Sequence, residues 1–251
     1  MSSDSERCPA LWPDQLWQDF RFAFRMLLKQ PGFTIITTLT LALGIGANTA
    51  IFSIVNAVLL RPLPYPEPDR VLFIAEGDKT NPGQGTFSVS LPDYLDWRRD
   101  NTIFENLALS RVESTTLSDI PGRNPEQIST ALATANFFKV IGVSAQLGRT
   151  FTEEEDKVGG PLLVVISDRL WQRVFQRDPA VIGKAVTFQN QPAMVIGVMP
   201  AEMATPQDTD AWFPMMRRAN NGAWTNRIIH PWLFAWGRLK PGVTLEQARA
   251  R

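Results

Sequence analysis

The sequence contains one long stretch without a charged side chain, the 31 residues from Gln30 to Leu60. It reads QPGFTIITTLTLALGIGANTAIFSIVNAVLL. A bilayer span needs about 20 apolar residues, and a soluble helix of this length would carry a charged face. At about 1.5 Å per residue, such a helix is longer than the ~30 Å hydrocarbon core. We therefore predict a single transmembrane helix over residues 30–60, either tilted or projecting beyond the membrane.

The charges that flank this stretch indicate its orientation. Arg21, Arg25 and Lys29 precede it, whereas Arg61 is the one basic residue that follows it closely. Because basic residues remain on the cytosolic side, the N-terminus is predicted to be cytosolic. Residues 61–251 would then lie outside, which in a bacterium means on the periplasmic side of the inner (plasma) membrane.

A cleaved signal peptide is the alternative interpretation of the same stretch, because LALGIGANTA resembles an apolar region that ends in small residues. The basic region before it is long, however, and the apolar run continues through Leu60. Signal peptides have shorter apolar cores. These two features favour an uncleaved anchor.

Small side chains recur every four residues in the predicted span: Thr38, Ala42, Gly46 and Ala50. Such a stripe lets a second helix approach closely. Asn48 and Asn56 are amides in or near the lipid and need hydrogen-bond partners there. We expect the stripe and Asn48 to pack against other transmembrane helices, from another chain or from a part of the protein beyond this sequence. The alternative is a lone anchor whose small residues are incidental.

The segment before the span, residues 12–29, has the pattern of a basic amphipathic helix. Arg21, Arg25 and Lys29 share one face. The other face is apolar and consists of Trp17, Phe20, Phe24 and Leu27. Pro31-Gly32 then interrupts the pattern. Such a helix is suited to the inner surface of the lipid bilayer, or its apolar face packs on other protein.

The remainder of the chain predicts an α+β domain. Residues 61–70 have proline at alternate positions and indicate a stiff, extended linker. Residues 71–251 mix short strands, short helices and hairpins. The domains are thus 1–29, 30–60, 61–70 and 71–251. The last helix starts at Thr244 and the sequence stops less than three turns later, so we expect a C-terminal truncation.

The elements expected in the folded domain are short. The expected strands are Val71–Ala75, Phe87–Ser90, Leu107–Leu117, Glu126–Ala133, Leu162–Ile166, Ala185–Phe188, Ala193–Val198, Ala211–Phe213 and Trp232–Arg238. The expected helices start at Ser90, Asn136, Thr152, Ser167 and Thr244. Thr152-Glu153-Glu154-Glu155 has the pattern of a capping box.

The composition argues against several classes of function. The chain has 25 Lys and Arg residues and 25 Asp and Glu residues. It therefore lacks the net positive charge that would indicate nucleic acid as a partner. Cys8 is the single cysteine and His230 the single histidine, so no disulfide can form within the chain, and a structural zinc site lacks the His and Cys ligands that it needs. The acidic run Glu153–Asp156 is interpreted as a solvated helix N-terminus.

Catalytic motifs are also missing from the sequence. It contains neither a GxSxG nor a GxxxxGK[ST] pattern, and His230 is interpreted as a loop residue. We therefore expect no enzyme activity and no catalytic, cofactor-binding or metal-binding residues. A membrane-tethered hydrolase would need an active serine or His230.

The segment DFRFAFRMLLKQPGFTIITTLTLALGIGANTAIFSIVNAVLLRPLPYPEPDRVL resembles the N-terminus of MacB–FtsX-type ABC-transporter permeases, in particular the duplicated orphan permeases. The resemblance continues through LPDYLDWRRDNTIFENLA, ATANFFKVIGVSAQLGRTFTEEED, VVISDRLWQRVFQRDPAVIGKAVTFQNQPAMVIGVMP and GRLKPGVTLEQARA. The similar segments cover most of the chain in the expected order.

This resemblance implies a MacB-like periplasmic core domain, porter-like and α+β, between a first and a second span. It implies a permease subunit, or a fragment of one, that couples a separate cytosolic ATPase to periplasmic transport or mechanotransmission. The later spans and the loop that contacts the ATPase are not in the sequence, so the resemblance implies that the partner helices come from a second permease copy or from the missing C-terminal part. The alternative is a single-pass, membrane-anchored binding or sensor module without transport activity.

Overall fold

The computed structural model describes residues 13–55, 65–78, 81–86, 88–203, 205–206 and 208–249. The chain divides into two compact units, Met1–Pro62 and Leu63–Arg251. Each unit is described by itself. Residues 1–12, 56–64 and 250–251, which include Cys8, Asn56 and the first part of the predicted linker, lie outside the described residues.

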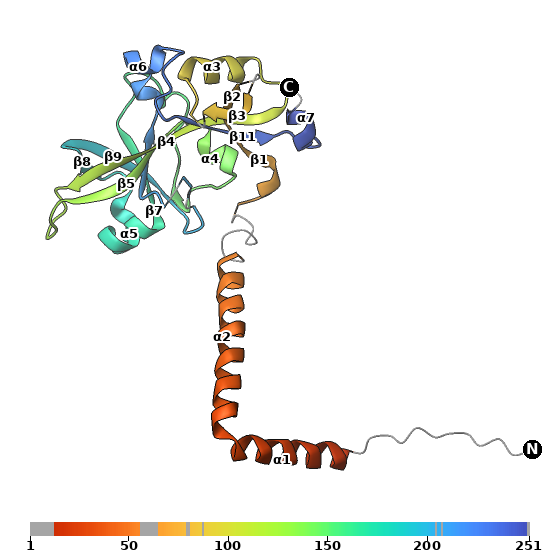
Figure 1. Ribbon diagram of the computed structural model, residues 1–251. Coiled ribbons are helices and arrows are strands. Elements are labelled where there is room, and N and C mark those ends of the chain that lie inside the picture. Colours follow the sequence, from red (N-terminus) through yellow and green to blue (C-terminus); the bar gives the residue numbers. More distant parts are fainter. Residues whose placement is uncertain are drawn as a thin grey trace, which may run out of the picture. The chain divides into compact units, whose positions relative to one another are not determined.

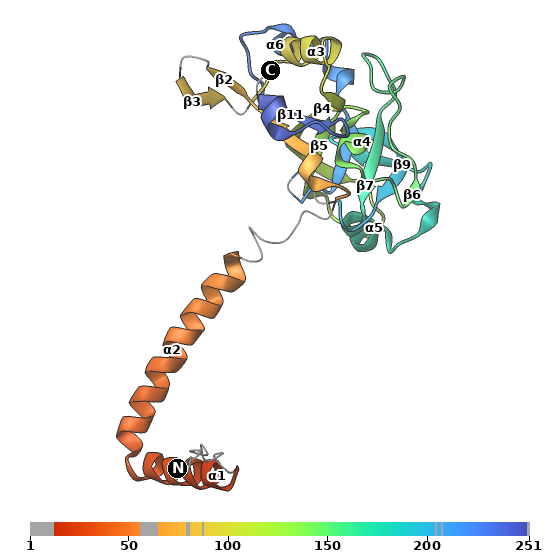
Figure 2. The same cartoon turned by 90° about the vertical axis from the view of Figure 1, so that its right-hand side faces the viewer.

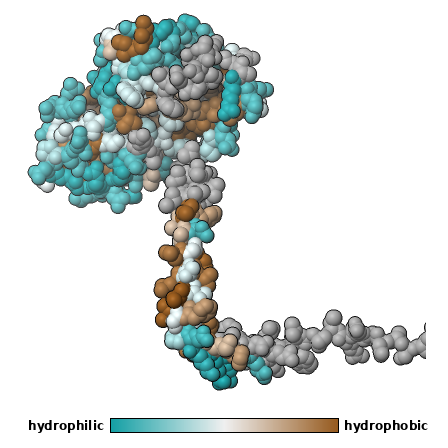
Figure 3. Space-filling model, in the orientation of Figure 1, coloured by the Kyte–Doolittle hydropathy of each residue, from teal (hydrophilic) through white to brown (hydrophobic). Residues whose placement is uncertain are grey.

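The first unit consists of two helices that meet at a bend (Figure 1): α1 (Pro13–Lys29) and α2 (Pro31–Val55). The Thr34 hydroxyl donates to the carbonyls of Leu27 (2.7 Å) and Gln30 (3.1 Å), which ties the start of α2 to the end of α1. Residues Pro31–Ser53 have a mean hydropathy of 1.7 and no buried residue. Figure 3 shows apolar side chains over the surface of α2. This long apolar N-terminal helix agrees with the sequence prediction.

The second unit is built on a mixed sheet. Its strands are β1 (Val71–Ile74), β4 (Phe104–Ser118), β5 (Glu126–Ala133), β6 (Leu147–Gly148), β7 (Leu163–Ser167), β8 (Ala185–Phe188), β9 (Gln191–Met199), β10 (Ala211–Pro214) and β11 (Phe234–Leu239). Among the described residues the strand order is β1-β11-β4-β5-β10-β7-β9-β6. The β10–β5 and β7–β9 pairs are parallel and the others are antiparallel. Because β8 pairs with both β4 and β9, six of the strands form a closed circuit.

Side chains from alternate positions of the strands form two hydrophobic clusters. On β7, Val164 and Ile166 belong to one cluster, and Leu163 and Val165 to the other. This is the period-two alternation of a strand whose two faces are both covered. The continuous apolar run of β7 therefore reflects burial on both sides.

Short helices cover the sheet (Figures 1 and 2). They are α3 (Leu91–Arg99), α4 (Phe137–Ile141), α5 (Asp168–Phe175), α6 (Gly222–Thr225) and α7 (Leu245–Arg249), with 3-10 turns η2 (Pro68–Arg70), η3 (Pro179–Val181) and η4 (Met216–Arg218). Ser90 caps α3 and Ser167 caps α5 through their side chains, as the sequence predicted. At α7, Thr244 and Gln247 form a reciprocal capping box.

Several segments differ from the sequence prediction. The expected strand Phe87–Ser90 contributes, among its described residues, an isolated bridge between Val89 and Leu233. The strands β2 (Glu76–Asp78) and β3 (Asn81–Thr86) pair as a separate two-stranded sheet, which projects from the domain (Figure 2). Residues 65–70, which we call the exit segment, were expected to be extended, but they contain η2 and a left-handed Glu67 with φ of 49°. Tyr65 is buried. The second half of the predicted linker therefore lies against the domain.

Candidate functional site

The small-residue stripe of α2 is open in this chain. Thr38, Ala42, Gly46 and Ala50 are all exposed, at the spacing that places them on one face. A Cβ atom added at Gly46 would meet no described atom within 4 Å. Among the described residues of the first unit, nothing covers the stripe, so this face of α2 is open to another helix.

The polar side chains of α2 differ in whether they form hydrogen bonds within the helix. The hydroxyls of Thr40, Thr49 and Ser53 donate to the carbonyl four residues earlier at 2.8, 2.8 and 2.7 Å. These bonds are internal to the helix and suit an environment without water. By contrast, no hydrogen bond joins the Asn48 amide to a residue that the structure describes, and Asn48 is exposed. Asn48 thus offers a donor and an acceptor to a partner.

Helix α1 carries the predicted basic residues on its surface. Arg21, Arg25 and Lys29 are exposed, and Lys29 lies in the last turn, where a cation interacts favourably with the helix dipole. The apolar side chains of α1 are also exposed: Trp17 by 68%, Phe24 by 56% and Leu27 by 46%. The side chain of Phe20 lies outside the described residues. Both faces of α1 are thus open, as lipid contact would require.

The predicted helix at Thr152 is wrong. Residues 152–156 form a turn in which the Thr152 N–H donates to Glu155 at 3.0 Å, which is half of a capping box. Gly159, with φ of 75°, and Gly160 follow at once, so no helix propagates. The Arg149 guanidinium bonds to Glu155 at 2.7 Å and lowers the pKa of that carboxyl.

The last member of the acidic run, Asp156, is not solvated, contrary to the sequence interpretation. It is 8% exposed. Its carboxylate accepts the backbone N–H of Ala135 at 2.8 Å and that of Met216 at 2.7 Å. Burial raises the pKa of Asp156 above its ordinary value, and it outweighs the two N–H donors. Asp156 therefore joins two distant segments of the domain.

The single histidine lies in the loop before β11. His230 Nε2 is 2.5 Å from a carboxylate oxygen of Glu76, and Nδ1 is 3.1 Å from the Ile228 carbonyl. The pair links this loop to the two-stranded sheet β2–β3. The described residues contain no group of three or more His, Cys, Asp or Glu side chains that could hold a metal ion.

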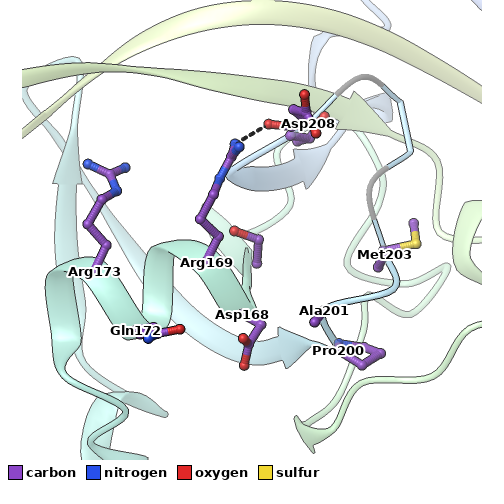
Figure 4. A pocket seen from close by; sticks show the side chains of 10 residues that line it. Asp168, Arg169, Gln172, Arg173, Pro200, Ala201, Met203 and Asp208 are labelled. Atoms are coloured by element: carbon purple, nitrogen blue, oxygen red, sulfur yellow. Dashed lines mark hydrogen bonds between the residues drawn. The ribbon is translucent and has the colours of Figure 1, made fainter. Parts of the chain in front are cut away.

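One cavity of about 370 Å³ lies where β7 and β9 end and α5 begins (Figure 4). Three of its charged side chains, Asp168, Arg169 and Arg173, are paired with neighbouring side chains. Arg169 Nε donates to Asp210 at 3.0 Å, and Arg169 also bonds to the Asp208 carbonyl. Arg173 pairs with Glu126 at 2.7 Å, and Asp168 with Arg177 at 2.8 Å. Among the described residues, the Asp208 carboxylate is thus the one charge of this lining without an ion pair, and the other three charges are compensated.

A mixed α+β domain that follows a long apolar helix is the architecture that the sequence predicted. The family model for the MacB-like periplasmic core domain matches residues 34–251. The chain belongs to this family, whose members are periplasmic domains of MacB/FtsX-like ABC-transporter permeases and are not catalytic.

Solved structures share the fold. The periplasmic region of MacB from Actinobacillus actinomycetemcomitans is similar with 17% identity and a TM-score of 0.55, covering 72% of this chain and 79% of that one. The extracellular domain of the noncanonic ABC-type transporter YknZ from Gram-positive bacteria is similar with 16% identity and a TM-score of 0.51, covering 72% and 87%. No curated protein gives a significant match.

Proposed function

We propose that the chain is the membrane permease subunit, or a part of it, of a MacB/FtsX-like ABC system. In this role it couples a separate cytosolic ATPase to periplasmic transport or mechanotransmission. The observation that carries the proposal is the extent of the family match, which starts at residue 34 inside the apolar helix and continues through the domain. The helix and the domain thus belong to one functional unit. The resemblance to duplicated orphan permeases makes that subgroup the proposed one.

The proposed arrangement follows the domains of the sequence. Residues 1–29 lie on the cytosolic side, with α1 at the lipid surface, and residues 30–60 cross the inner membrane of a bacterium. Residues 61–70 lead to the periplasmic domain, 71–251. The open stripe and Asn48 of α2 are the proposed contacts with other transmembrane helices, since both are exposed in this chain. If α2 has no helix partner, the alternative function, a single-pass membrane-anchored binding or sensor module, is favoured.

The orientation can be tested with Cys8, the single cysteine of the chain. A membrane-impermeant maleimide is expected to leave Cys8 unlabelled in intact spheroplasts and to label it after permeabilisation, because the N-terminus is cytosolic. The matched variant Cys8→Ser with Ser144→Cys places the thiol on an exposed residue of the domain. It is expected to react in intact spheroplasts. Labelling of Cys8 without permeabilisation would show the opposite orientation.

The stripe can be tested with two glycines of α2. Gly46 lies on the stripe, and Gly44 lies about 160° around the helix from it, at 3.6 residues per turn. A Cβ at either position meets no described atom within 4 Å. Gly46→Leu is expected to reduce copurification of two differently tagged copies from detergent, because it blocks close helix approach. Gly44→Leu is the control. Equal effects of both changes would remove the stripe from the proposal.

A further inference from the structure

The exit segment Tyr65–Arg70 is the first part of the domain unit that the structure describes after α2, and it is firmly attached. Tyr65 is only 9% exposed, and its hydroxyl is hydrogen-bonded to the Thr205 hydroxyl. β1 follows directly and pairs with β11, Val71 opposite Arg238. The segment therefore reaches the sheet within a few residues and has little freedom of its own.

Arg238 of β11 holds this segment from inside the domain. Its guanidinium is almost fully buried, with a side-chain exposure of 7%. Nε donates to the Val140 carbonyl at 2.8 Å, and Nη2 donates to the carbonyls of Ile141 at 3.0 Å and Pro66 at 3.1 Å. One side chain thus joins the end of α4 to the exit segment.

Gly142 makes room for this guanidinium. It ends α4 with φ of 81°, a conformation that favours glycine. A Cβ at this position would lie 2.6 Å from Arg238 Nη2. The helix ends here in a way that exposes its last carbonyls to the arginine, and these carbonyls have no partner within the helix.

Arg70 forms the second half of the attachment. Its Nε and Nη2 both donate to the Leu239 carbonyl, at 3.0 and 2.7 Å. Its guanidinium also pairs with Glu67 and Glu105, each at 2.7 Å. Arg70 therefore binds the exit segment to the last residue of β11, next to Arg238.

Packing alone does not explain a buried arginine at position 238. Among the described residues, the one carboxylate within 4 Å is Glu67, at 3.8 Å, and its side chain is 63% exposed. Removing a charge from water is costly, and an apolar side chain would fill the space more cheaply. What the guanidinium adds is several donors in a fixed plane. These donors join segments that are far apart in the sequence.

We propose that Arg238 and Arg70 form a rigid joint between the exit segment, α4 and β11, so that displacement of the chain at Tyr65 moves the domain as one body. An unattached exit segment would instead move without the domain. The use of the joint rests on the proposed function, in which α2 spans the membrane and transmits motion. In that function Arg238 and Arg70 are positioning residues.

Hydrogen exchange on the full chain in detergent micelles tests the joint. Arg238→Gln is expected to accelerate exchange of peptides 65–74 and 137–143 by about tenfold or more, the change produced by about 1.4 kcal/mol of local stability. Exchange of β7 and β9 is expected to stay unchanged. Arg70→Gln is expected to accelerate peptide 65–74 only, because Arg70 does not bond to α4.

Arg169→Gln is the matched control. Arg169 also bonds to a buried carboxylate and a backbone carbonyl, but it lies on α5 in another part of the domain (Figure 1). It is expected to leave peptide 65–74 unchanged. Unchanged exchange of peptide 65–74 in both Arg238→Gln and Arg70→Gln would overturn the joint. So would a uniform acceleration across the domain, which indicates a merely stabilising role. These outcomes do not depend on the orientation of α2, so the joint and the proposed function can fail separately.

Discussion

Asp156→Ala is expected to lower the free energy of unfolding of the domain by about 3 kcal/mol. The change leaves the N–H groups of Ala135 and Met216 without their acceptor, and a buried unsatisfied donor costs about 1–3 kcal/mol. Relief from burying the carboxylate offsets part of this loss. For a domain of this size, the midpoint of thermal unfolding should fall by roughly 6–12 °C. Circular dichroism of the purified chain measures the shift.

Glu154→Ala is the control for this prediction. Glu154 lies in the same turn and is exposed, so its removal should change stability by less than about 0.5 kcal/mol. Asp156→Asn should give an intermediate loss, because the amide oxygen accepts one N–H while its NH₂ group faces the other. If Asp156→Ala and Glu154→Ala unfolded at the same temperature, the assigned role of Asp156 would be wrong.

The same carboxyl predicts a pH dependence. Burial raises the pKa of Asp156 in the folded domain above the ordinary value of 3.8. The ordinary value is the pKa of Asp156 in the unfolded chain. Between the unfolded and the folded pKa, the folded state binds more protons than the unfolded state, so the contribution of Asp156 to stability falls as pH rises. Above the folded pKa it becomes constant. The stability of the wild type minus that of Asp156→Asn should therefore decrease as pH rises from about 3.8.

Local patterns in the sequence were sufficient for most elements of the domain. Ser167 followed by Asp168–Phe175 gives the observed boundaries of α5, because a side-chain cap defines where a helix starts. The strand expected at Glu126–Ala133 has the same bounds as β5. The strand expected at Leu162–Ile166 corresponds to β7, whose continuous apolar run reflects burial on both faces. The small-residue stripe of α2 could also be proposed from spacing alone, since a helix has a fixed period.

The residues missed by the sequence interpretation act through tertiary contacts. Asp156 reads as one more acid in a solvated run, and only the fold shows that it meets the Met216 N–H, 60 positions away. Arg238 reads as one charge in a strand, yet it bonds to Pro66, 172 positions away. The alternate prolines of the linker suggested an extended spacer because proline fixes φ. No local signal indicates that the domain binds the carbonyl of one of them.

Replacing both Leu39 and Leu43 of α2 by arginine is expected to abolish stable membrane insertion. α2 has eleven large apolar residues, each contributing about −0.3 to −0.6 kcal/mol, or roughly −3 to −7 kcal/mol in all. Each central arginine adds about 2.5–3.5 kcal/mol, so two of them cancel the driving force. Carbonate extraction of membranes should show the wild-type chain in the pellet and the double variant lost from it.

Phe24→Arg with Leu28→Arg is the matched control, because it places two arginines four residues apart on α1, outside the proposed span. Both side chains are exposed, by 56% and 66%. The chain should remain in the pellet, since a surface helix keeps its charges in water. A wild-type chain recovered in the soluble fraction without its first 60 residues would instead support the cleaved signal peptide. In that case the mature protein would have no transmembrane helix to transmit motion, and the exit segment would be a structural feature of a secreted domain.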